Sequence, residues 1–164
     1  MLICSKRIAQ GRGLAQALLK RATFVSIDWD TRQRSRFDAI DNQGRQLGIF
    51  MPRVTVVRGG DVLVAEDGSL IRVEAAAQQV LRISSQAGDA AYALMRAAYH
   101  LGNRHVPIEL QKDHLKIEPD HVLADMLRAM HLIVNAVEEG FEPEGGAYGA
   151  GGHAHGHAHD HGHG

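Results

Sequence analysis

The order of secondary-structure signals between residues 78 and 138 restricts the fold more than any other feature of this sequence. Two amphipathic helical patterns follow Asp89 and Asp120, and each aspartate is an expected N-cap. Four short alternating apolar runs surround them, at residues 79–84, 106–110, 114–118 and 132–137. The resulting βαββαβ order is that of a ferredoxin-like sandwich, in which two helices cover one face of an antiparallel sheet and leave the opposite face for a partner.

The spacing of apolar residues also predicts which side of each helix is buried. The first helix is expected to end at Gly102 and to bury Leu94, Met95, Ala98 and Leu101. The second is expected to bury Val122, Leu123, Met126, Leu127 and Met130. We therefore predict a ferredoxin-like domain over residues 76–140.

The first 75 residues have a different pattern, in which turn signals separate short β-branched or apolar runs. The expected strands lie at residues 47–50, 54–57, 61–64 and 70–73. Residues 13–19 fit either a further part of this β unit or a helix. The predicted fold class is α+β, with an N-terminal all-β domain (1–75), the ferredoxin-like βαββαβ domain (76–140) and a disordered, His-rich C-terminal tail (141–164).

Composition narrows the possible functions. Lys and Arg number 18 against 19 Asp and Glu, a formal charge of -1, which argues against nucleic acid or an anionic membrane as partner. We expect a cytoplasmic protein, because the N-terminus does not resemble a signal peptide and no window is apolar for long enough to span a bilayer. The single cysteine, Cys4, cannot form a multi-thiolate metal site, so any metal must rely on nitrogen and oxygen ligands.

Histidine is the anomaly in this composition, with 11 copies. Neutral imidazole suits nickel, copper and zinc but not magnesium or calcium. After Ala150 the chain holds only Gly, Ala, His and one Asp, so it has nothing to bury and should bind metal loosely. An engineered tag is the alternative, although tags are usually uninterrupted histidine runs. Histidines occupy every second position of this tail, as His153, His155, His157, His159, His161 and His163.

Among the other five histidines, His105 and His121 are the candidate ligands. His105 lies in the predicted loop after the first helix, and His121 lies at the first turn of the second, where helix capping is an alternative role. His100 and His131, near helix ends, are explained as well by the helix dipole, and His114 as an exposed strand residue.

Several short segments form a distinctive set. One of them, residues 58–63 (RGGDVL), lies in the first domain. The others are residues 102–107 (GNRHVP), 120–123 (DHVL), 125–127 (DML), 141–144 (FEPE) and 146–148 (GAY), followed by the histidine-rich end. Together these segments resemble the family of the urease accessory protein UreE.

The resemblance implies a homodimer joined through the ferredoxin-like domains, in which His105 of each subunit meets near the two-fold axis to hold one nickel ion. Tail histidines would complete the shell, and the β domain would dock partners. Some family members have a further histidine two positions before the one matching His121. Here that position is Pro119, so the resemblance implies a weaker second site or none.

The predicted function is that of a non-enzymatic metallochaperone that delivers Ni²⁺ for urease maturation. Zn²⁺ and Cu²⁺ are further ions that the same imidazoles can bind. The partners that the resemblance implies are the GTPase UreG, the other urease accessory proteins and the urease apoprotein. The sequence does not decide whether two dimers associate into a dimer of dimers when metal binds. The alternatives are a metal-storage or buffering protein and, less favoured without a His-Glu-x-x-His motif, a metal-dependent hydrolase.

Overall fold

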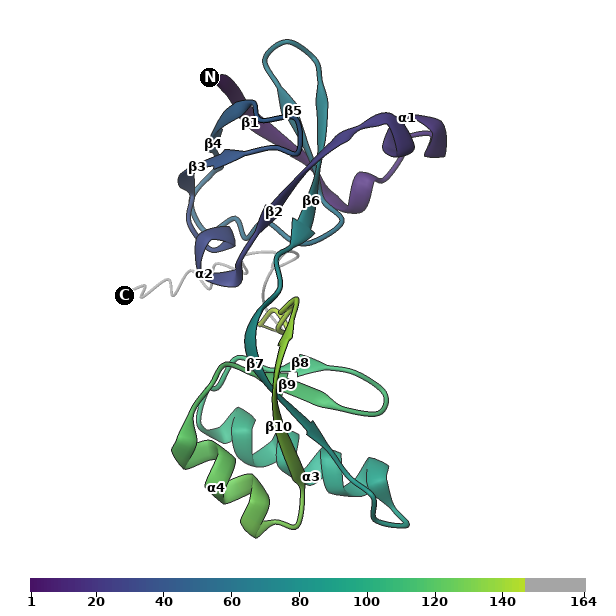
Figure 1. The fold of residues 1–164 in the computed structure, drawn as a ribbon, viewed down its shortest axis with the longest axis vertical. Helices are drawn as coiled ribbons and strands as arrows, with labels where there is room; N and C mark the ends of the chain where they lie inside the picture. Colours follow the sequence, from purple (N-terminus) through teal and green to yellow (C-terminus); the bar gives the residue numbers. More distant parts are fainter. Residues whose placement is uncertain (147–164) are drawn as a thin grey trace, which may run out of the picture.

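The computed structural model describes residues 1–146, which form two domains stacked end to end (Figure 1). The N-terminal domain is built on a six-stranded mixed sheet in the order β2-β6-β5-β1-β4-β3. Its strands are β1 (Leu2–Ile8), β2 (Thr23–Ile27), β3 (Arg36–Ile40), β4 (Gln46–Phe50), β5 (Val62–Ala65) and β6 (Leu70–Ala75). Short helical segments join them, namely η1 (Ala9–Gly11), α1 (Gln16–Arg21) and α2 (Trp29–Arg32).

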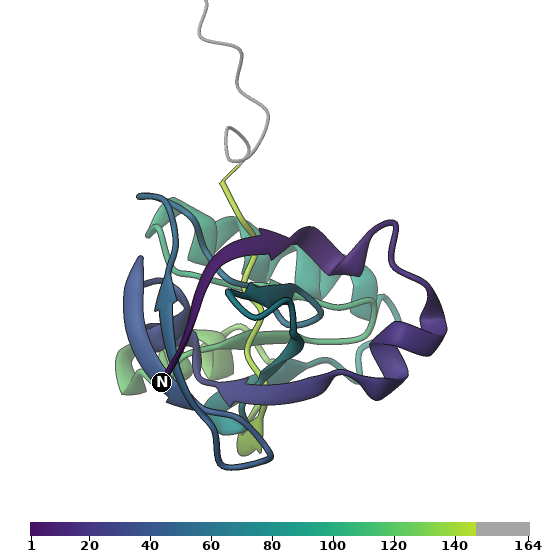
Figure 2. The same ribbon diagram turned by 90° about the horizontal axis from the view of Figure 1, so that it is seen from above.

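The two edge strands of this sheet approach each other, which gives the domain a barrel-like shape. Beyond β3, the backbone N–H of Asn42 donates to the carbonyl of Phe24 in β2 at 2.9 Å, and the Asn42 side chain accepts from the Phe24 N–H at 2.9 Å. Figure 2, which views the molecule from above, shows the curved course of these strands. Alternation along each strand directs one set of side chains inward, where Leu47, Ile49 and Ile71 are fully buried.

The structure decides two expectations for this domain. Residues 54–57 do not form a strand, so that prediction is wrong: they belong to a loop in which Val54 has a φ of +61°. β-branched residues also occur in loops when a side chain is buried. Here Val57 is buried in the β-domain core, and its N–H donates to the Arg32 carbonyl at 3.0 Å. Residues 13–19, left open between strand and helix, overlap α1.

The second domain has the predicted ferredoxin-like topology. Its sheet is antiparallel in the order β10-β7-β9-β8. Figure 1 shows both helices on the same side of this sheet. The elements are β7 (Gln78–Ser84), α3 (Ala90–Asn103), β8 (Glu109–Leu110), β9 (Leu115–Ile117), α4 (His121–Ala129) and β10 (Ile133–Glu139). Both predicted N-caps are confirmed, because Asp89 accepts from the N–H of Tyr92 at 3.1 Å and Asp120 from that of Leu123 at 2.9 Å.

The buried faces of the helices are rotated slightly from the prediction. Leu94, Leu101 and Leu127 are buried as expected, but Met95 is 66% exposed and Val122 is 63% exposed. Ala97 and Ala124 take the inner positions instead. A small side chain lets a helix lie close to the sheet, so the alanines occupy the contact line and the larger residues beside it stay outside.

The sheet face opposite the helices is partly occupied by the chain itself. Lys116 on β9 is buried there, and its Nζ lies 3.1 Å from Glu109 and 3.4 Å from Glu139. Near the domain junction, Val80 on the same face packs against Trp29 and Phe141. The expectation that this face is left for a partner is therefore wrong where these residues cover it.

A cluster of aromatic and charged residues joins the two domains. Trp29 and Phe141 meet edge to face, with ring centroids 6.1 Å apart. The guanidinium groups of Arg32 and Arg58 lie 5.4 and 4.9 Å from the centre of the Trp29 ring, and both form ion pairs with Glu142. We call Trp29, Arg32, Arg58, Phe141 and Glu142 the junction cluster.

The absence of a side chain at Gly59 lets the backbone there lie close to the carboxylate of Glu142. The Gly59 N–H donates to Glu142 Oε1 at 2.7 Å, and a Cβ on residue 59 would lie only 2.9 Å from the same oxygen. Two segments that are distant in the sequence, residues 58–63 and 141–144, thus meet at the junction. Arg32 is completely buried, and burial lowers the pKa of its guanidinium while Glu142 opposes that shift.

We predict that Glu142→Ala destabilises the protein by about 3 kcal/mol, because it leaves the buried charge of Arg32 without its counterion. Urea unfolding followed by Trp29 fluorescence measures the change. Glu144→Ala is the matched control, since Glu144 is exposed and its side chain has no ion pair within residues 1–146. Equal midpoints for the two variants would show that Glu142 does not stabilise the junction.

Candidate metal centre

His105 lies in the tight turn that ends helix α3. The N–H of Arg104 donates to the carbonyl of Leu101 at 3.1 Å, and the N–H of His105 donates to that of Gly102 at 3.0 Å. His105 itself adopts a φ of +57°, the left-handed conformation common just after a helix but unusual for a residue with a side chain. The imidazole is thereby exposed at a position that the hydrogen-bonded turn holds in place.

A shallow hollow of about 300 Å³ brings His105 next to the loop that precedes α4. The lining residues are Arg104, His105, Val106, Pro107, Glu118, Pro119, Asp120 and Leu123. Besides the imidazole of His105, the lining contains the carboxylates of Glu118 and Asp120. The Asp120 carboxylate already accepts the helix-capping hydrogen bond from the Leu123 N–H. We call this hollow the His105 site.

The structure places the two predicted folded-domain ligands differently. His105 lines the hollow, whereas His121 follows Asp120 as the first residue of α4, is exposed and does not line it. Pro119, which replaces the additional histidine of some family members, is part of the lining. The sequence analysis did not name Glu118 as a candidate ligand. Its position directly before Pro119 and the N-cap Asp120 was the sequence signal that could have placed it near the site.

The other three folded-domain histidines do not line the His105 site. His100 lies on the last turn of α3, with its ring 5.3 Å from that of Tyr99, and His131 follows α4 with a φ of +65°. His114 Nδ1 lies 2.7 Å from Asp113, and this hydrogen bond lowers the pKa of the Asp113 carboxyl. The six tail histidines lie outside the described residues.

Across residues 1–146, no three His, Cys, Asp or Glu side chains gather closely enough to hold a metal ion. The His105 site therefore supplies only part of a coordination shell from one chain. Transition-metal sites in proteins commonly use three or four protein ligands, so further ligands must come from elsewhere if this site is to hold an ion.

Cys4 is fully buried in the β-domain core, and burial, with a smaller contribution from Asp67, raises the pKa of its thiol to about 11. Metals bind the thiolate, which Cys4 does not form at neutral pH.

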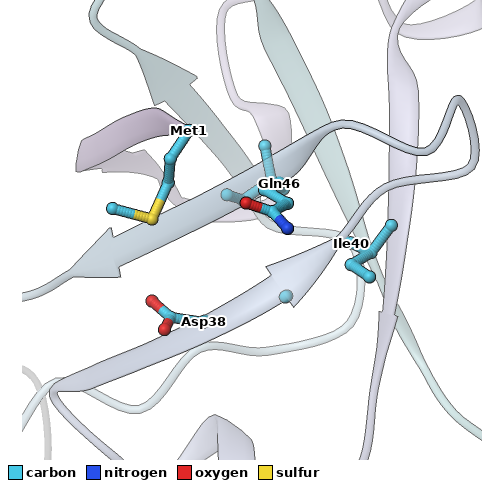
Figure 3. A pocket seen from close by; sticks show the side chains of 6 residues that line it. Met1, Asp38, Ile40 and Gln46 are labelled. Carbon is cyan, nitrogen blue, oxygen red and sulfur yellow. The ribbon is translucent and has the colours of Figure 1, made fainter.

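A separate hollow lies on the β domain, lined by residues of the paired strands β3 and β4 and by Met1. Figure 3 shows the side chains of Met1, Asp38, Ile40 and Gln46 around it. The lining includes one carboxylate, that of Asp38, and no imidazole. This hollow is not a candidate metal centre.

The fold and the site together define a class of protein: a barrel-like β domain followed by a ferredoxin-like domain that presents a histidine from a helix-ending turn. The family model described as the UreE urease accessory protein, N-terminal domain, matches residues 4–76, and the C-terminal domain model matches residues 78–164. The chain belongs to the UreE urease accessory protein family, as the sequence resemblance predicted.

Individual relatives agree along nearly the whole chain. The urease accessory protein UreE of Polaromonas naphthalenivorans (strain CJ2) is 71% identical over 154 residues, which cover 93% of this chain and 74% of the relative. That of Albidiferax ferrireducens is 70% identical over 155 residues, covering 94% and 89%. That of Ralstonia nicotianae is 51% identical over 153 residues, covering 93% and 71%. Within residues 1–146, no helix is long and apolar enough to cross a membrane.

We predict that Cys4 reacts with iodoacetamide at least about a hundredfold more slowly in the native protein than in urea, because its thiol is buried and protonated. Mass spectrometry of timed samples measures this rate. Addition of nickel should also produce no thiolate-to-nickel charge-transfer absorption. Either rapid native alkylation or such a band would contradict the assignment of Cys4 to the core.

Proposed function

We propose that this chain is a nickel metallochaperone of urease maturation, which binds Ni²⁺ through histidines and delivers it in the cytoplasm without catalysing a reaction. The observation that carries the proposal is the His105 site, an exposed imidazole on a hydrogen-bonded turn beside two carboxylates but lacking a complete shell. An incomplete site exchanges its metal readily, which suits transfer more than permanent retention. The relatives' shared name, urease accessory protein, supports urease as the recipient.

A second subunit is the first source of further ligands. Helix α3, which ends in the His105 turn, exposes Tyr92 (57%), Met95 (66%) and Tyr99 (66%). The spacing of these residues places them along one side of the helix. Exposed apolar stripes of this kind mark protein interfaces. We propose that two copies pair through this α3 stripe about a two-fold axis, so that each chain contributes one His105 to a shared site.

The tail is the second source of ligands. The N–H of Glu144 donates to the carbonyl of Ile108 at 2.8 Å, and Glu144 lines a small hollow together with Val106 and Pro107. The chain thus leaves the folded domain beside the strand that follows His105. The first tail histidine, His153, is nine residues further on, and nine residues can span about 30 Å. We propose that His153, His155, His157, His159, His161 and His163 capture Ni²⁺ and pass it to the His105 site.

His121 has a lesser role in this proposal. It is adjacent to Asp120 at the rim of the same loop, where it can take part in transfer between the tail and the His105 site. Because Pro119 offers no ligand side chain, a second site around His121 is expected to be weaker or absent. Zn²⁺ and Cu²⁺ are expected to bind the same imidazoles, since the ligand types do not select nickel by affinity alone.

The domains divide the work. We propose that residues 1–75 dock partners, residues 76–140 form the dimer and the His105 site, and the tail histidines collect metal. The first residues of the expected tail (141–164) belong to the folded part instead, because Phe141 and Glu142 are in the junction cluster and the Glu144 N–H donates to the Ile108 carbonyl. The proposed partners are the GTPase UreG, the other urease accessory proteins and the urease apoprotein. A storage protein would bind many ions without such partners, and the delivery measurement below separates the two functions.

We predict that His105→Gly removes one Ni²⁺ ion per dimer, while truncation after Gly152 lowers the metal stoichiometry but leaves that ion bound. Glycine adopts the positive φ of this turn without strain, so the change removes only the imidazole. Isothermal titration calorimetry counts the ions. His131→Gly is the matched control, because His131 also has a positive φ and is exposed after a helix. Equal losses in both variants would contradict the assignment.

The same variants test delivery. Apo-urease and its other accessory proteins, at limiting nickel, should gain activity with the wild-type chain and with His131→Gly, and less with His105→Gly. If the wild-type chain makes no difference to nickel incorporation, this chain is not a delivery protein.

We also predict that Met95→Glu shifts the protein from dimer to monomer, because burying two carboxylates in the α3 stripe is unfavourable. Light scattering after size-exclusion chromatography gives the mass. Leu18→Glu is the control, since Leu18 is an exposed apolar residue on α1 of the β domain. A monomer–dimer balance that responds equally to both changes would place the interface elsewhere.

A further inference from the structure

Strand β1 loses its neighbour on one side after its first three residues. It pairs in parallel with β4 only from Leu2 to Cys4, where Cys4 lies opposite Ile49, but it pairs with β5 as far as Ile8. The register with β5 shifts between Cys4 and Lys6, which makes Ser5 the extra residue of a β-bulge. A bulge bends its strand, and here the bend coincides with the end of the pairing with β4. In the part of the chain that the structure describes, no strand lies beside residues 5–8 on that side.

A groove of about 510 Å³ follows this open strand edge. On the other side it is bounded by the loop after β4, and Val64 of β5 contributes to the lining. The lining residues are Ser5, Lys6, Arg7, Ile8, Met51, Pro52, Thr55 and Val64. We call this the β1 groove. An open strand edge presents backbone N–H and C=O groups to which another extended chain can pair.

In the loop beside the β1 groove, the apolar side chain of Val54 is exposed to solvent. Val54 is fully exposed, at 102%, and has a φ of +61°. A β-branched residue is strongly disfavoured in this conformation, so the surrounding loop must maintain it. The N–H of Thr55 donates to the Pro52 carbonyl at 3.2 Å. At the end of the loop, the N–H of the buried Val57 donates to the Arg32 carbonyl at 3.0 Å. Backbone strain that exposes an apolar side chain is typical of a contact residue.

The charges around the groove indicate the chemistry of its partner. Lys6 lines it and Arg53 precedes Val54 in the exposed loop, and neither forms an ion pair within residues 1–146. Arg7 is already paired with Asp61 at 2.7 Å. Residues 1–75 contain twelve Lys and Arg against eight Asp and Glu, a formal charge of +4 in a chain whose total is -1. This surface favours an acidic partner.

We propose that the β1 groove binds an extended acidic segment of a partner protein, which adds to β1 as a strand. The segment's backbone pairs with residues 5–8, its carboxylates contact Lys6 and Arg53, and one apolar side chain packs on Val54. The inference rests on the proposed function in one respect, since it assigns the docking role of the β domain to a specific surface and a specific partner chemistry.

The test uses the full chain labelled with ¹⁵N and two nine-residue probe peptides. One alternates Glu with Val and Thr, and the other has Lys at every Glu position. The acidic peptide should shift the amide signals of residues 5–8 and 51–55 and slow hydrogen exchange at residues 5–8. Shifts elsewhere, no shifts at millimolar peptide, or equal binding of the two peptides would overturn the proposal.

Charge and shape are then tested separately. Lys6→Glu with Arg53→Glu should weaken binding of the acidic peptide about tenfold and strengthen that of the basic one. The matched control is Lys20→Glu with Arg21→Glu on α1, two exposed charges outside the groove, which should leave binding unchanged. Val54→Gly relieves the strained φ and removes the apolar contact, so it should weaken binding without lowering the melting temperature.

Failure of this inference can be told from failure of the proposed function. Nickel titration and delivery to apo-urease report on the proposed function, whereas the peptide shifts report on the groove alone. A wild-type chain that delivers nickel but does not bind the acidic peptide at residues 5–8 overturns the inference only. One that binds the peptide but neither binds nor delivers nickel overturns the proposed function only.

Discussion

The buried charge of Arg32 is the interaction on which the arrangement of this molecule depends. A guanidinium fully removed from water is stable only with a counterion and hydrogen bonds, and Glu142 and the carbonyl of Phe141 provide them. Because Arg32 belongs to the first domain and Glu142 follows the last strand of the second, satisfying this charge holds the two domains together. It also anchors the segment from which the tail continues, next to the strand that follows His105.

This anchoring gives the proposed metal relay its geometry. His105 is held by the hydrogen bonds that end α3, and Glu144 is held against Ile108, so both the proposed ligand and the start of the tail have defined positions. In the proposed relay, the ligands that complete the shell come from a second copy and from the tail, and each of them can be replaced. A site assembled from fixed and exchangeable parts can receive an ion and release it again, whereas a closed shell of four ligands from one domain retains its metal.

Much of the fold could be predicted because its determinants are local. Asp89 and Asp120 cap their helices through bonds to residues three positions along, and the order of six elements between residues 78 and 138 indicates the ferredoxin-like topology directly. The errors have a common cause. Residues 54–57 have the composition of a strand, and Met95 and Val122 fit apolar stripes, yet whether such a residue faces a core depends on what packs against it. His105 was predicted as a ligand from its loop position and from the family resemblance, and its neighbour Glu118 was found only in the structure.

The sequence by itself determined the family, the topology of the second domain and the presence of a histidine-rich end, since these depend on residue type and on short-range spacing. Only the tertiary structure decided that residues 58–63 and 141–144 form one junction, that His105 shares a hollow with Glu118, and that β1 has an open edge. These features join segments up to 110 residues apart, and the burial of Arg32 against Glu142 connects positions whose pairing no local pattern specifies. Long-range contacts of this kind depend on the shape of the completed core, which the order of residues encodes only through folding.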